Sequence, residues 1–77
     1  MVLDLIIHSG DDGYSAEIPS VKGCESWAHE EEKAIENVLE LMRFYLKLTP
    51  RHIVEVDYSR KIKNRKVLKV LIRANEQ

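Results

Sequence analysis

The stretch EEKAIENVLELMRFYLKL, residues 31–48, decides the fold. It contains no Gly or Pro and is rich in strong helix formers, so it predicts a helix of about five turns. Apolar residues recur along it at spacings of three and four, which is the period of a helix face. They form two stripes, the first made of Ala34, Val38, Leu41, Tyr45 and Leu48 and the second of Ile35, Leu39, Met42 and Leu46.

The two stripes predict a helix with more apolar surface than one sheet can cover. At about 100° per residue they lie side by side and span roughly 180–200°, or about 220° with Phe44, whereas a helix on a single sheet needs only about 100°. Ala34 is small and permits close approach to a sheet, so we assign its stripe to the protein's own core. The other stripe is then the expected interface of a homodimer or homotetramer, formed by Ile35, Leu39, Met42 and Leu46.

The size of the chain also favours self-association. Its 77 residues are expected to form a single domain, 1–77, and a core this small yields only about 3–5 kcal/mol of net stability. The single Cys excludes an internal disulfide, which leaves oligomerisation as the common reinforcement. The sequence has neither the pattern of a signal peptide nor an apolar run of about 18 residues, so we expect a cytoplasmic protein.

The charge of the chain is strongly polarised, although the net charge is only −1. Residues 1–48 contain ten Asp or Glu and four Lys or Arg, whereas residues 49–77 contain three and eight. Ordinary surface variation is one interpretation. The alternative is that an acidic face binds a basic protein partner.

Five stretches around the helix have strand patterns. They are Met1–His8, Tyr14–Pro19, Cys24–Ala28, His52–Tyr58 and Val67–Arg73. The sequence therefore predicts an α+β domain with a three-stranded antiparallel meander, one helix and one or two further strands, since the fourth stretch could be a partly ordered link. The strand after the helix can lie parallel to the first strand. Thr49-Pro50 is expected to end the helix, and residues 74–77 are expected to fray.

One continuous segment, GYSAEIPSVKGCESWAHEEEKAIENVLELMRFYL, carries a resemblance to a known family. The matching residues are Tyr14, Ala16, Glu17, Pro19, Gly23, Cys24, Glu32, Ala34, Ile35, Glu36 and Asn37. They resemble the HicB-like antitoxin family. The resemblance implies a partial RNase-H-like fold and a non-enzymatic protein, without a cofactor, that binds and masks a small basic HicA-like RNA-cleaving toxin. Many members also carry a C-terminal DNA-binding helical segment, but strand patterns follow Leu48 here, so no separate DNA-binding domain is expected.

Charged and aromatic residues suggest where partners bind. Trp27 and Glu25 are the candidate partner-binding residues, because large aromatics favour interfaces, although Trp27 could instead cover the start of the helix. The basic segment 60–69 offers an alternative function, in which a solitary domain with a regulatory role binds nucleic acid. A solvated hairpin and contact with an acidic surface of a sister subunit are further interpretations of this segment. Its candidate nucleic-acid contacts are Lys61, Lys63, Arg65 and Lys66.

Catalysis and metal binding are weakly supported by the sequence. A two-metal nuclease needs converging carboxylates, for which the candidates are Asp4, Asp57, Glu36 and Glu40. The last two lie on the side of the helix opposite Ala34, so they would not converge with Asp4, and no enzyme is expected. His8, His29 and His52 lack metal-ligand spacing. Cys24, which has no CxxC partner, is expected to be a buried thiol.

Overall fold

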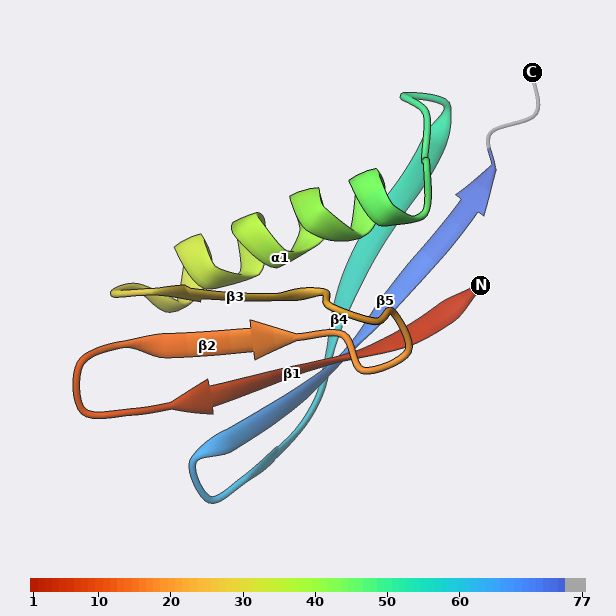
Figure 1. The fold of residues 1–77 in the computed structure, drawn as a ribbon. Helices are drawn as coiled ribbons and strands as arrows, with labels where there is room; N and C mark the ends of the chain where they lie inside the picture. Colours follow the sequence, from red (N-terminus) through yellow and green to blue (C-terminus); the bar gives the residue numbers. More distant parts are fainter. Residues whose placement is uncertain (75–77) are drawn as a thin grey trace.

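The computed structural model describes residues 1–74 of the chain, and for residues 58 and 59 it describes the backbone alone. One helix packs on one face of a five-stranded sheet (Figure 1). The strand order is β3-β2-β1-β5-β4, and every neighbouring pair is antiparallel. In chain order the elements are β1 Val2–Ser9, β2 Tyr14–Glu17, β3 Glu25–Ala28, α1 Glu31–Tyr45, β4 His52–Ile62 and β5 Arg65–Ala74.

The predicted α+β order, three strands followed by a helix and further strands, is confirmed. Both stretches after the helix are strands. The stretch from His52, for which a partly ordered link was the alternative, forms β4 and is 11 residues long. β4 runs in the same direction as β1 but does not pair with it, because β5 lies between them. β5 buries Leu68, Val70 and Ile72, which suits an inner position, whereas β4 has no fully buried residue among its described side chains and takes the edge. Of residues 74–77, which were expected to fray, Ala74 instead ends β5 and pairs with His52, and residues 75–77 lie outside the described residues.

The helix ends at Tyr45, three residues before the predicted end at Leu48. Lys47 has a positive φ of 55°, and the amide of Leu48 donates to the carbonyl oxygen of Arg43 at 2.9 Å. These are the features of a Schellman cap, in which a left-handed residue turns the chain out of the helix. The chain therefore leaves the helix before it reaches Pro50.

The core lies between α1 and the inner face of the sheet. α1 packs over β2 and β3, and its fully buried residues are Ala34, Val38 and Met42. The assignment of Met42 to a partner interface is therefore wrong, and Tyr45, assigned to the core, is 45% exposed. The buried arc runs between the two predicted stripes. Because both stripes are apolar, only contact with the sheet fixes the rotation of the helix about its axis.

The remaining residues of the second stripe lie on the flank of α1. Ile35, Leu39 and Leu46 are partly buried against the core, and so are Leu41 and Leu48 of the first stripe. The exposed apolar surface of the helix is therefore not concentrated in one stripe. The expected role of Ile35, Leu39 and Leu46 in an oligomer stays a prediction.

Candidate partner-binding face

The sheet has an inner face that α1 covers and an opposite face that no other described element covers, which we call the outer face (Figure 1). Residues directly opposite each other across a strand pair project on the same side of the sheet, so the register assigns each residue to a face. On β1 and β5 the outer face carries two apolar pairs, Val2 with Leu71 and Ile6 with Val67, and the Asp4–Lys69 ion pair lies between them. The centre of the outer face therefore alternates between apolar pairs and an ion pair.

Two rows of side chains cross the outer face near the end of β1. In strand order from β3 to β4, the first row is Glu25, Glu17, Ile6, Val67 and Arg60. The second row is Trp27, Ser15, His8, Arg65 and Ile62. One edge of the outer face is thus acidic and aromatic, whereas the opposite edge is basic and apolar.

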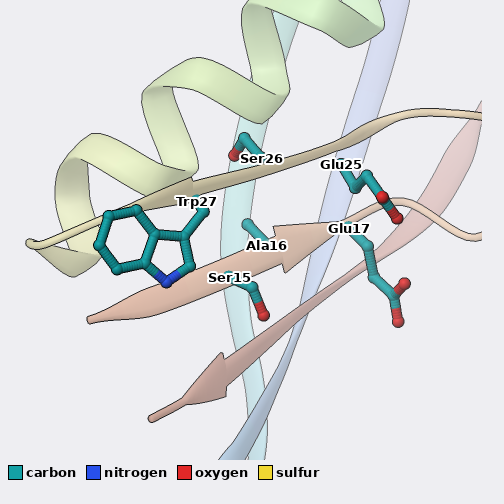
Figure 2. A pocket seen from close by; sticks show the side chains of 6 residues that line it. All are labelled: Ser15, Ala16, Glu17, Glu25, Ser26 and Trp27. Carbon is teal, nitrogen blue, oxygen red and sulfur yellow. The ribbon is translucent and has the colours of Figure 1, made fainter. Parts of the chain in front are cut away.

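The acidic edge, which we define as Glu17, Glu25 and Trp27, surrounds an open hollow of about 470 Å³ lined by Ser15, Ala16, Glu17, Glu25, Ser26 and Trp27 (Figure 2). Glu17 and Glu25 lie directly opposite each other, and such a like-charged pair destabilises a sheet. The ring Nε2 of His8 is 3.5 Å from Glu17 Oε1, whereas Glu25 makes no ion pair with any described residue. A basic group from outside would therefore find an uncompensated carboxylate here.

The indole of Trp27 is held in place although 52% of the residue is exposed. Its ring meets the His29 ring edge-on with centroids 4.7 Å apart, and His29 Nδ1 donates to the Asp12 carbonyl oxygen at 3.1 Å. Gly13 lies so close that an added Cβ would come within 2.8 Å of the indole. Trp27 thus presents a large, oriented aromatic surface to solvent, as anchor residues of interfaces do.

The segment around the acidic edge is itself acidic. Residues 9–32 contain seven Asp or Glu, namely Asp11, Asp12, Glu17, Glu25, Glu30, Glu31 and Glu32, and one basic residue, Lys22. Glu30 is the N-cap residue of α1, but its side chain makes no capping hydrogen bond. The concentration of negative charge favours encounter with basic molecules.

The predicted nucleic-acid contacts do not form one surface. β4 and β5 are joined by a two-residue loop, and Lys61, Lys63 and Arg65 are exposed around it. Lys66 instead lies on the inner face, where its Nζ is 2.9 Å from Glu31 Oε2. By register Lys61 projects to the same side as Lys66, and Arg65 projects to the outer face. Three exposed cations therefore point in different directions around the hairpin tip.

The carboxylates considered for a nuclease do not converge. Asp4 and Asp57 lie on the outer face on either side of Lys69, whose Nζ donates to Asp4 Oδ1. Glu36 and Glu40 are on α1, which lies on the inner face (Figure 1). Within residues 1–74 no three His, Cys, Asp or Glu side chains come together as a metal site would require.

Cys24 is buried, as the sequence predicts. Its Sγ donates to the Val38 carbonyl oxygen at 3.5 Å. Burial raises the pKa of the Cys24 thiol, which keeps it in the protonated form. This side chain therefore contributes to the core and lacks the properties of a nucleophile.

Comparison with protein-family models, curated proteins and solved structures gives no significant match for this chain. Among residues 1–74 no helix has the length and apolar character needed to cross a membrane. Glu25 and Trp27 are the partner-binding residues predicted from the sequence. The prediction did not include Glu17, Arg60 and Ile62, which lie on the same face. Only the sheet register brings these five into adjacent rows, since they come from β2, β3 and β4.

Proposed function

We propose that the chain is a non-catalytic, cytoplasmic HicB-like antitoxin or antitoxin-related protein that binds and masks a small basic HicA-like RNA-cleaving toxin. The observation that carries the proposal is the acidic edge, where a half-exposed Trp27 stands beside the like-charged pair of Glu17 and Glu25. The resemblance of residues 13–46 to HicB-like proteins supports the same function. We propose no catalytic residue and no cofactor.

The acidic edge suits a basic protein surface in both charge and shape. A Lys or Arg side chain that enters the hollow would lie between Glu17 and Glu25 and offset their mutual repulsion. The neighbouring Trp27 would bury its ring against apolar surface of the partner, and aromatic anchors of this kind dominate the affinity of many interfaces. The toxin's RNA-binding surface is expected to be basic, because it must bind phosphates. An acidic cover would therefore compete directly with RNA.

The proposal requires that a neighbouring gene encodes a small basic protein, and the test is coexpression of that protein with this chain. We expect that protein alone to arrest bacterial growth, the wild-type chain to restore growth, and the double variant Glu17→Lys/Glu25→Lys to lose the rescue. The matched control, Glu36→Lys/Glu40→Lys, changes the net charge equally on the helix and should rescue like wild type. If the basic neighbour is harmless, or if both double variants rescue equally, the proposal is wrong.

The second candidate function is nucleic-acid binding by a solitary regulatory domain. It is favoured by the exposure of Lys61, Lys63 and Arg65 around the β4–β5 turn. Binding of this kind should weaken steeply as salt is raised, and the triple variant with Ala at these positions should bind at least tenfold more weakly in a fluorescence anisotropy titration with RNA or duplex DNA. Binding that is unaffected by the triple variant would exclude the hairpin as the contact.

A further inference from the structure

We propose that two copies of this chain associate through their outer faces, related by a two-fold axis that runs along β1. We call Arg60, Ile62 and Arg65, on the opposite side of the outer face, the basic edge. In this dimer the acidic edge of each copy lies over the basic edge of the other. The two sheets pack as a sandwich with the helices on the outside. The occupant of the outer face is thus a second copy of the chain itself.

The position of β1 makes the outer face self-complementary. β1 is the third of five strands, so rotation about an axis along it places β3 of one copy over β4 of the other and β2 over β5. An axis across the strands would instead place every strand over its own copy, with acid against acid at one edge and base against base at the other. Closed two-fold dimers are the commonest oligomers, and charge selects the first arrangement here.

The two side-chain rows match under this one rotation. Glu25 comes to lie over Arg60 of the second copy, and Trp27 comes to lie over Ile62. Trp27 and Ile62 are 52% and 39% exposed, so contact between them would remove apolar surface from water. Near the axis, Ile6 lies over its own copy. The outermost residues of each row therefore meet a complementary residue in the same row of the other subunit.

The ion pairs within one chain support a two-fold axis along β1, because they show which outer-face charges still lack a partner. On the outer face Lys69 pairs with Asp4, and Arg73 pairs with Glu55 at 3.0 Å. Among the described residues, four outer-face charges make no ion pair within the chain: Glu25, Asp57, Arg60 and Arg65. The rotation brings three of them toward opposite charge: Glu25 and Arg60 lie over each other, and Arg65 lies over Ser15, one row from Glu17. Asp57 lies outside the two rows, level with Asp4 and Lys69.

The size of the outer face is adequate for a small dimer. Five strands about 4.8 Å apart, with about seven residues each at 3.3 Å, give a projected area of roughly 550 Å². The corrugation of the side chains increases the accessible area toward the ~800 Å² per partner of an ordinary stable interface. A uniformly basic partner could cover only the β2–β3 half, because Arg60 and Arg65 would repel it from the other half. A second copy fits both halves.

Self-association would also regulate the acidic edge. Since the second copy covers Glu25 and Trp27 with its own basic hairpin, a basic toxin would have to compete with it, and this consequence alone rests on the proposed function. The dimer itself does not, and its test uses only the purified chain. Failure of either proposal can therefore be recognised separately.

The test is sedimentation equilibrium of the full chain and two charge-reversal variants. We expect wild type to have twice its 9.0 kDa monomer mass at low salt, and to dissociate more readily at high salt. Glu17→Lys/Glu25→Lys and Arg60→Glu/Arg65→Glu should each dimerise at least tenfold more weakly. An equimolar mixture of the two should form a heterodimer, because both edges then meet opposite charge again. This recovery also shows that both variants are folded.

Three results would overturn the proposal. The first is a wild-type chain that stays monomeric at millimolar concentration. The second is a dimer that neither charge reversal weakens, or a mixture of the variants that forms no heterodimer. The third is a dimer that Leu39→Glu abolishes while the charge reversals leave it intact, because the flank of α1 would then be the interface.

Discussion

Replacement of Met42 by Ala separates a core residue from an interface residue. Met42 is fully buried between α1 and the sheet, and truncation of such a side chain costs about 2–5 kcal/mol. A core of this size yields only about 3–5 kcal/mol of net stability, so the variant should lose most of it. A loss of about 3 kcal/mol corresponds to a decrease in Tm of roughly 12–24 °C at this chain length.

The assay is thermal unfolding followed by circular dichroism, with wild type and variants compared at several matched protein concentrations. Leu39→Ala, on the partly buried flank of the same helix, is the control and should lower the free energy of unfolding by only about 1–2 kcal/mol. The Met42→Ala decrease should be similar at every concentration, because the lost contacts lie within one subunit. A Tm change below about 4 °C, or a loss seen only where wild type is oligomeric, would refute the placement of Met42 in the core.

Three further variants test local features of the fold. Gly13→Ala should lower the free energy of unfolding in urea by about 1–3 kcal/mol, because its Cβ would lie 2.4 Å from the Ala28 carbonyl oxygen. The control Gly10→Ala has ordinary contacts and should lower it by under about 0.5 kcal/mol. Lys47→Gly should raise the Tm by roughly 2–8 °C, because Gly adopts the left-handed cap conformation without strain; an unchanged Tm would argue against that cap. Burial raises the pKa of Cys24 above its ordinary 9.0, so the folded state holds the thiol proton more tightly than the unfolded state. The free energy of unfolding therefore decreases as the pH rises above about 9. In Cys24→Ala the urea midpoint should decrease less over the same pH range.

The long edge strand β4 helps to explain why we place self-association on a face. An exposed strand of 11 residues could pair edge to edge with another copy. β4 carries Glu55, Asp57, Arg60 and Lys61, and its register shifts between Tyr58 and Arg60. Charges and bulges of this kind discourage edge pairing, because they interrupt the ladder and leave charges to be desolvated. These features of β4 therefore disfavour an assembly through the sheet edge.

The partner residues could be predicted only in part. Trp27 and Glu25 were found from the sequence, because a large aromatic and a carboxylate on the same side of a short strand stand out without tertiary information. Arg60 and Ile62 lie in a segment whose composition is that of a solvated basic hairpin. Their place in line with Glu25 and Trp27 depends on the register of four strand pairs, including a bulge in β4. No local pattern encodes that register.

The sequence alone determined the order of the elements, the existence of one amphipathic helix and the separation of charge along the chain. Those features follow from local propensity and periodicity, which act over a few residues. Only the tertiary structure decided that β5 lies between β1 and β4, that Met42 faces the core and that the acidic and basic edges share one face. These outcomes depend on contacts between residues far apart in the chain, such as His8 with Arg65, and on which strand gains most by burial.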